Sequence, residues 1–344
     1  ACNNRCLFCL DSVHQDGGRR SVDTIKEKIR AGRERGAIRL VLSGGEATIH
    51  KDFVSLIAYG RSVGFSHIQT ITNGRMFSYP RFLSAAVRAG LSEITFSMHG
   101  HTADLHDRLV GVPGAFGQAL EGLDMALCDG RPIVNVDVCL NRYNIDFLPQ
   151  ILQFYIDRGV REFDLLHLIP FGRAYEERSR HDLNYDIEQA VGPIAKALEM
   201  SRREDVHIWL NRFPPPYLEG FEDLIQDPYK LLDEARGAYA GYEALLLHGE
   251  PPFCYGPDRC HLCYMQDLCE TFATWRKRFV TDDFEVFRIE ISEDQPAIEI
   301  PEVMPDTLWI RAANVAVAVK ASQAFSGSKL IIELDSYAQL SSAL

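Results

Sequence analysis

Strand-like and helix-like segments alternate along the first half of the chain, and this order constrains the fold more than any other feature. From residue 20 to about 168, amphipathic segments of helical period alternate with short apolar, β-branched runs. Helices expected at 21–36, 53–63, 80–89, 115–127 and 148–158 lead into strands expected at 38–42, 67–72, 93–97, 133–140 and 162–168. The order is typical of a parallel α/β architecture of six units, counted with one strand upstream of residue 1.

Polar or glycine-bearing loops follow these strands. They read Ser43-Gly44-Gly45-Glu46, Thr72-Asn73-Gly74-Arg75, Ser97-Met98-His99-Gly100 and Asn141-Arg142. Because parallel α/β proteins build their sites at the carboxyl ends of the strands, we expect the four loops to converge on one cavity. After residue 170 the alternation weakens into a helix near 187–201, a strand at 206–210 and a proline-rich stretch at 213–216.

Seven of the nine cysteines fall into two tight groups, and the first is Cys2, Cys6 and Cys9. Cysteines this close together in a chain of 344 residues indicate metal ligands in a reducing cytosol rather than disulfides. Three thiolates spaced C-x-x-x-C-x-x-C can ligate three irons of a [4Fe-4S] cluster and leave the fourth iron open to substrate. A zinc ion is the alternative, although structural zinc usually takes four closed ligands.

The segment from Cys2 to Cys9, with an aromatic residue before the third cysteine, resembles the signature of the radical S-adenosylmethionine (SAM) superfamily. Gly44-Gly45-Glu46 resembles that family's GGE motif, and Thr72-Asn73-Gly74 and Ser97-Met98-His99-Gly100 follow in the family's order. The resemblance covers about residues 1–175. It implies a partial (β/α)6 TIM-like barrel with a smaller C-terminal cysteine-bearing domain, and reductive cleavage of SAM to a 5′-deoxyadenosyl radical.

By the same resemblance, Cys2, Cys6 and Cys9 hold the catalytic cluster, and its free iron chelates the methionine end of SAM. The family implies that backbone at Gly44 and Gly45 approaches the methionine amine, with Glu46 close by. The remaining residues expected at SAM, through its carboxylate, ribose or adenine, are Phe8, Asn73, Ser97, Asn141, His167 and Leu168.

The second group supplies four thiolates, enough to complete another [4Fe-4S] cluster, at Cys254, Cys260, Cys263 and Cys269. Its last three members resemble the SPASM and twitch auxiliary-cluster extensions, although the further downstream cysteine of the full SPASM pattern is absent. A zinc ion held by all four thiolates is the competing interpretation. We therefore expect a radical SAM barrel over 1–212, an auxiliary-cluster region over 213–280 and an extension of unknown role over 281–344.

The formal charge of −12 argues against nucleic-acid binding, since such proteins usually carry a basic surface. No apolar run approaches the length of a membrane span, and no signal peptide is visible, so we expect a soluble, cytoplasmic protein.

Auxiliary-cluster extensions recur among peptide-modifying maturases, so a peptide or protein substrate is our first expectation. A small molecule or nucleotide is the second, and a non-enzymatic iron–sulfur or zinc redox protein is the third. The resemblance also implies a reductant such as flavodoxin or ferredoxin.

Overall fold

The computed structural model describes most of the first 225 residues and short stretches beyond them. The described residues are 1–14, 17–169, 171–178, 180, 182–214, 217–225, 244–245, 260, 266, 269–271, 273–274, 286–291, 307–312 and 329–334. The chain divides into two compact units, one of residues 1–242 with 252–266 and one of residues 243–251 with 267–344. These limits do not test the domain boundaries predicted at residues 212 and 280, which stay predictions.

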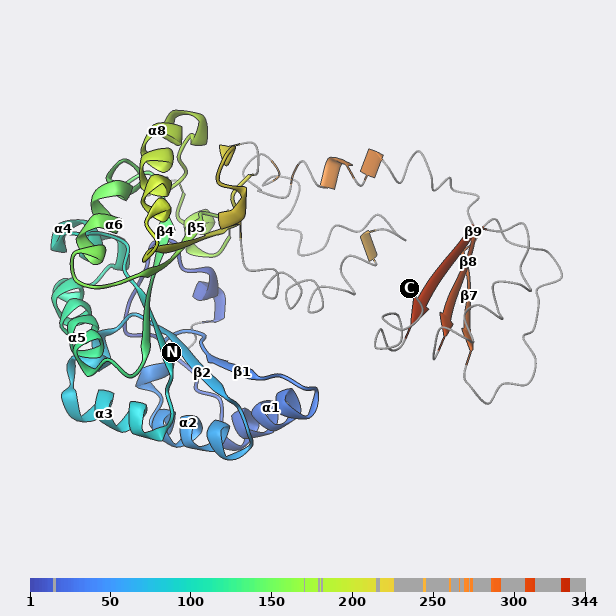
Figure 1. The fold of residues 1–344 in the computed structure, drawn as a ribbon, viewed down its shortest axis with the longest axis horizontal. Helices are drawn as coiled ribbons and strands as arrows, with labels where there is room; N and C mark the ends of the chain where they lie inside the picture. The colour runs from blue at the N-terminus through green and yellow to red at the C-terminus, as the bar shows by residue number, and fades with distance from the viewer. Residues whose placement is uncertain are drawn as a thin grey trace. The chain divides into compact units, whose positions relative to one another are not determined.

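A six-stranded parallel sheet organises the first unit (Figure 1). Its strands are β1 (Arg39–Leu42), β2 (His67–Thr72), β3 (Glu93–Ser97), β4 (Ile133–Leu140), β5 (Glu162–His167) and β6 (His207–Asn211). They lie side by side in chain order, and each pairs in parallel with the next. All six carboxyl ends therefore meet along one edge of the sheet, where parallel α/β proteins form their sites.

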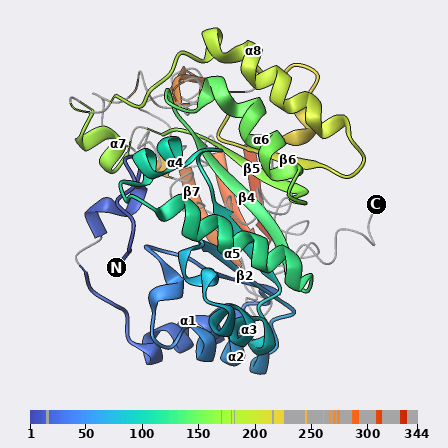
Figure 2. The same ribbon diagram turned by 90° about the vertical axis from the view of Figure 1, so that its left-hand side faces the viewer.

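The helices form an arc around the outside of the strands (Figures 1 and 2). They are α1 (Val22–Glu34), α2 (Phe53–Ser62), α3 (Pro80–Ala89), α4 (Ala103–Val110), α5 (Ala115–Asp129), α6 (Leu148–Ile156), α7 (Arg173–Glu176) and α8 (Ile187–Leu198). Short 3-10 turns lie at Leu10–His14, Ala47–Ile49, Arg75–Ser78, Ile145–Phe147, Glu199–Arg202 and Glu222–Leu224. Ser21 caps α1 by accepting a 3.2 Å hydrogen bond from the Thr24 amide, as its residue type predicts.

Alternation along the strands separates a packed outer face from a polar inner one. In β4, Val134, Val136, Val138 and Leu140 are buried in the core beneath the helices. The residues between them, Asn135, Asp137 and Cys139, face the opposite side because successive strand side chains alternate. The inner face can therefore carry chemistry without disturbing the core.

The predicted fold class is confirmed. The strands expected at 67–72, 93–97 and 133–140 appear with those bounds, and the others differ by one residue at one or both ends. Helix α4 is the main addition, because none of the helices predicted between residues 20 and 168 covers its residues. Among the described helices, none is long and apolar enough to cross a lipid bilayer.

The second unit contains a three-stranded parallel sheet. Its strands are β7 (Val286–Ile291), β8 (Thr307–Ala312) and β9 (Lys329–Leu334), paired in that order. All three strands lie within the extension of unknown role predicted over 281–344.

Candidate functional site

The first three cysteines line one cavity of about 260 Å³ at the carboxyl ends of the strands. Ten residues that the sequence predicted for the site border it together: Cys2, Cys6, Phe8, Cys9, Gly45, Glu46, Asn73, Ser97, His167 and Leu168. They come from the N-terminal loop and from the ends of β1, β2, β3 and β5. The expected convergence of the strand-end loops thus produces one cavity with three thiols on its wall.

Two distant elements hold the backbone of the cysteine loop. The amides of Arg5 and Leu7 donate to the carbonyls of Val110 and Leu109 at the end of α4, at 2.8 and 2.9 Å. After β5, the Arg173 amide donates to the Cys9 carbonyl at 3.0 Å, and its guanidinium donates to the Cys6 carbonyl at 3.1 Å.

Gly172 makes the second approach possible. Its φ of 55° is in the left-handed region, and a Cβ there would overlap the Cys9 carbonyl oxygen. The cysteine loop is therefore held in part by Gly172 and Arg173, which come much later in the chain.

The segment after β2 holds the other end of the loop. The Asn73 side-chain amide donates to Asn3 Oδ1 at 2.6 Å. The Arg75 guanidinium donates to the Asn3 carbonyl at 2.6 Å and to Asn4 Oδ1 at 3.0 Å. Asn4 is itself buried. The Thr-Asn-Gly-Arg motif thus positions the cysteine loop as well as bordering the cavity, a role that the sequence did not reveal.

Glu46 joins the loop after β1 to the end of β2. Its Oε1 accepts from the Thr48 amide, the Thr48 hydroxyl and the Thr72 hydroxyl at 3.1, 2.5 and 2.7 Å. Its Oε2 accepts from the Asn73 amide at 2.7 Å. The side chain is only 3% exposed, so these four bonds offset the cost of burying the carboxylate. One lone-pair direction of Oε2 is left for a donor in the cavity, which an ammonium group can satisfy.

The three thiols have the chemistry of a cluster site. Burial raises the pKa of Cys2 and of Cys6, and for Cys6 the nearby Cys2 and Cys9 raise it further. Three thiolates so close together need positive charge to compensate them, and iron ions supply it. Among the described residues, no three His, Cys, Asp or Glu side chains converge on a point that suits a single metal ion. Three thiolate donors fit a [4Fe-4S] cluster with one open iron, whereas a closed structural zinc site takes four protein ligands.

The cavity is also bordered by residues that the sequence did not assign to it, among them Asp137, Cys139 and Arg212. The Ser97 hydroxyl donates to Asp137 Oδ2 at 3.4 Å. Burial raises the pKa of the Cys139 thiol to about 12, and the positive charge of Arg212 opposes that shift. The alternation of β4, in which Val138 and Leu140 are buried in the core, puts Cys139 on the inner face, where it packs against a small cluster that includes Leu168. Asp137 could have been found by the same count along β4.

His99 borders the cavity as a neutral donor. Its Nδ1 accepts a hydrogen bond from the Cys139 amide at 3.1 Å, so the ring proton of the neutral imidazole is on Nε2. Burial, and then the neighbouring His106, hold the pKa of His99 well below its usual value. Its ring meets the Phe8 ring edge-on, with centroids 4.6 Å apart. This pair joins the cysteine loop to the end of β3.

His167 and Leu168 form another part of the wall. The His167 Nδ1 lies 2.6 Å from the Tyr185 hydroxyl, and its ring centroid lies 5.6 Å from that of Phe213. Burial lowers the pKa of His167 to about 4, so the ring is neutral at physiological pH. A neutral ring beside Leu168 is a surface on which a purine can stack.

Two predicted SAM contacts lie away from this cavity. The Asn141 side chain donates to the Cys139 carbonyl and accepts from the Tyr143 amide, both at 3.0 Å, and it is fully buried in its own loop. Gly44 borders a neighbouring, larger cavity instead. For the second cysteine group, Cys254 and Cys263 lie outside the described residues, while Cys260 is exposed and Cys269 is half-buried.

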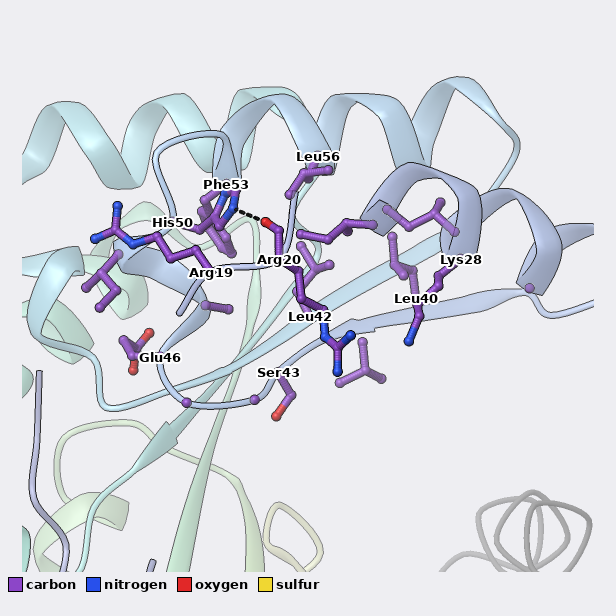
Figure 3. A pocket seen from close by; sticks show the side chains of 18 of the residues that line it. Arg19, Arg20, Lys28, Leu40, Leu42, Ser43, Glu46, His50, Phe53 and Leu56 are labelled. Carbon is purple, nitrogen blue, oxygen red and sulfur yellow. Dashed lines mark hydrogen bonds between the residues drawn. The ribbon is translucent and has the colours of Figure 1, made fainter. Parts of the chain in front are cut away.

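The larger cavity, of about 960 Å³, lies along the exposed edge of β1 (Figure 3). Arg19, Arg20 and Lys28 surround it, and His50 Nε2 lies 3.2 Å from the Arg20 carbonyl. Glu46 borders both cavities, but no cysteine borders this one among the described residues. The smaller cavity is therefore the candidate reaction site.

Comparisons with known proteins agree with this geometry. Residues 1–155 match the model of the Radical SAM superfamily. The chain is 25% identical over 321 residues to a probable GTP 3′,8-cyclase of Saccharolobus solfataricus, covering 93% of this chain and 92% of that protein. It is 28% identical to a probable GTP 3′,8-cyclase of Sulfurisphaera tokodaii, again over 321 residues and 93% of each chain.

Among solved structures, Streptococcus suis SuiB bound to S-adenosylmethionine matches with a TM-score of 0.51 at 12% identity. The match covers 61% of this chain and 47% of SuiB, so the chain spans about half of that protein, and it supports the fold alone.

These relatives show that the expectation of a peptide or protein substrate is wrong. Proteins similar over nearly the whole chain are named for a reaction of a nucleotide, which was the second expectation. The error has a physical reason, because cysteine spacing specifies the ligands of a cluster and says nothing about the pocket that selects the substrate. The superfamily match and the three-thiol cavity confirm the expected enzyme class. Residues 1–155 form a Radical SAM superfamily domain, and the chain is a radical SAM enzyme.

Proposed function

We propose that this chain reductively cleaves SAM at the cavity of Cys2, Cys6 and Cys9 and acts on a purine nucleotide, with GTP as the first candidate. The observation that carries the proposal is the extent of the cyclase relatives. They align over 93% of the chain at 25–28% identity, and so include the C-terminal half as well as the barrel. The reaction would join the 3′ carbon of the ribose to C8 of the guanine.

Each group of cavity residues has a task in this proposal. The three thiolates bind a [4Fe-4S] cluster, which when bound supplies the electron that splits SAM into methionine and a 5′-deoxyadenosyl radical. Glu46 offers its remaining lone pair to the methionine ammonium, and Gly45, where a Cβ would clash with the Ala1 carbonyl, lets the start of the cysteine loop pack beside it. Phe8, His167 and Leu168 present the apolar surface for adenine. Asn73 and Ser97 complete the wall near the methionine and ribose.

In the proposed substrate reaction, a hydrogen atom passes from the ribose 3′ carbon to the 5′-deoxyadenosyl radical, which becomes 5′-deoxyadenosine. The carbon radical then bonds to C8 of the guanine, and the resulting ring radical takes up one electron and one proton. A one-electron reductant such as a flavodoxin or ferredoxin supplies this electron and the one that cleaves SAM. Such intermediates need a reducing, oxygen-poor compartment, for which the cytosol is suited.

We also propose that Cys254, Cys260, Cys263 and Cys269 hold a second [4Fe-4S] cluster of the SPASM or twitch type. Their number and spacing support this assignment, and a zinc ion is the alternative outcome. Anaerobic reconstitution distinguishes the two, since two clusters require about seven to eight iron atoms per chain. One cluster and one zinc ion would give about half that iron content.

The reaction is tested with GTP deuterated at the ribose 3′ carbon. Reconstituted protein, SAM and reductant should yield 5′-deoxyadenosine that carries one deuterium, together with loss of GTP. GTP deuterated at C8 is the matched control and should transfer none. If 5′-deoxyadenosine forms at the same rate with and without GTP and never contains deuterium, the GTP assignment is wrong while the radical SAM assignment stands.

A further inference from the structure

The backbone turns sharply at Arg212, directly after β6. Its φ of 64° makes it the one residue other than glycine with a positive φ among the described residues. A side chain with a Cβ disfavours this region, so surrounding structure must hold it there. The neighbours do so: Asn211 and Phe213 are buried, 5% and 8% exposed, on either side of the turn.

The turn changes where the arginine points. Along β6, Ile208 and Leu210 are buried in the core beneath the helices. Strict alternation would put residue 212 on that same outer side, where a guanidinium has no place. Arg212 borders the three-thiol cavity instead. The unusual φ therefore takes a cation away from the core and brings it to the reaction site.

The charge of Arg212 is not committed to another side chain. Within the part of the chain that the structure describes, its guanidinium makes no side-chain hydrogen bond and no ion pair, and it borders the cavity. Of the three carboxylates that border the same cavity, Asp11, Glu46 and Asp137, the last two have donors of their own, since Glu46 accepts four hydrogen bonds and Asp137 accepts from Ser97. The positive charge of Arg212 also lowers the pKa of the Cys139 thiol, which borders the same cavity.

We propose that Arg212 is the anion-binding residue of this cavity, and that it holds a phosphate of the nucleotide substrate or the carboxylate of SAM. A planar guanidinium donates two parallel hydrogen bonds to either group, which gives orientation as well as affinity. Binding of a substrate phosphate by Arg212 rests on the proposed function, whereas binding of the SAM carboxylate rests only on the radical SAM assignment.

The test compares ligands that differ in one anionic group. Dissociation constants are measured on the reconstituted full chain for GTP against guanosine, and for SAM against decarboxylated SAM. Inorganic pyrophosphate is added as a phosphate probe that does not depend on guanine. The variants are Arg212→Gln, which removes the charge, and Arg212→Lys, which keeps the charge without the planar fork. Arg19→Gln, which removes an exposed charge at the larger cavity, is the matched control.

If Arg212 holds phosphate, Arg212→Gln weakens GTP and pyrophosphate at least tenfold and leaves guanosine and both forms of SAM unchanged. If it holds the carboxylate, the loss appears for SAM and disappears for decarboxylated SAM. Arg212→Lys should restore part of the lost affinity in either case. Equal affinities of Arg212→Gln, Arg19→Gln and the parent chain for every charged ligand would overturn the proposal.

A further variant and the nucleotide binding of the parent chain complete the test. Arg212→Gly removes the charge and also relieves the backbone, so it should reproduce the affinity losses of Arg212→Gln with an unfolding temperature no lower than that variant's. If the parent chain binds pyrophosphate but not GTP, the proposed substrate fails while Arg212 is still judged by pyrophosphate and SAM. If it binds neither, the comparison of SAM with decarboxylated SAM alone decides. Equal affinities of Arg212→Gln and the parent chain for SAM would then overturn the role of Arg212.

Discussion

The Thr72 hydroxyl donates a 2.7 Å hydrogen bond to the Glu46 carboxylate, across the gap between the ends of β2 and β1. The bond joins two loops that each border the cavity, and it lies beneath the surface that SAM is proposed to contact. It also explains why a Gly-Gly-Glu loop and a Thr-Asn-Gly loop, each ordinary as a turn, form a rigid site when they lie side by side.

Glu46→Gln should therefore destabilise the fold. The amide nitrogen would face backbone or hydroxyl donors in place of a carboxylate oxygen, and a buried unmatched donor costs about 1–3 kcal/mol. Urea unfolding of the reconstituted protein measures this loss. Thr72→Val removes a single donor to the carboxylate and should cost less than Glu46→Gln; equal losses would show that the network does not depend on the carboxylate.

Cys6→Ala should abolish formation of 5′-deoxyadenosine, because one iron of the cluster would lose its protein ligand. Product is measured by chromatography after anaerobic reconstitution. Cys128→Ala is the matched control, since Cys128 is an exposed free thiol near the end of α5. Cleavage of SAM by Cys6→Ala at the parent rate would contradict the site assignment.

Arg75→Ala should loosen the cysteine loop and speed the loss of iron. The change removes the donors to the Asn3 carbonyl and Asn4 Oδ1, which hold the loop in place. Bleaching of the cluster absorbance in the presence of a chelator measures the rate. Arg88→Ala provides the comparison, because Arg88 bonds within α3 to Ser84 and is far from the loop in sequence. Identical bleaching of the two variants would mean that Arg75 does not hold the loop.

Stability should fall as the pH falls below about 6.5. Burial lowers the pKa of His106 to about 4, whereas an unfolded histidine titrates near 6.5. Between these values the unfolded chain binds more protons, so the free energy of unfolding rises with pH across that window and declines as pH falls. The contribution of His106 is on the order of 2–3 kcal/mol across that range.

Unfolding free energies at pH 7 and 5.5 measure the effect, with His106→Gln as the test variant. The variant should show a shallower pH dependence than the parent chain. An unchanged slope would mean that His106 is not the titrating group, and His99 and His167 would be examined next, since burial lowers their pKa values too.

The sheet could be predicted from the sequence because each of its strands is a short apolar run bounded by clear turn signals. The cysteine loop and the GGE segment could be predicted because their residue types are tied to one chemistry. Neither Asp137 nor Arg212 belongs to such a motif, although the alternation along β4 is enough to place Asp137 on the inner face. Asp137 is one polar residue in an alternating strand, and the position of Arg212 depends on a local φ that no residue pattern announces.

Substrate choice was the other failure. The cysteine spacing of the C-terminal half pointed to peptides, but spacing reports only which metal group can be bound. The hydrogen bonds of Asn141 to its own loop likewise depend on tertiary packing that the sequence does not display.

The attachment of the cysteine loop to Arg173 has a consequence for biogenesis. The three thiols leave the ribosome well before Arg173, as the 167-residue separation of Cys6 and Arg173 shows. A nascent chain therefore lacks this support of the cysteine backbone until the fifth strand has been made and has packed. Iron insertion is expected to follow the packing of that strand.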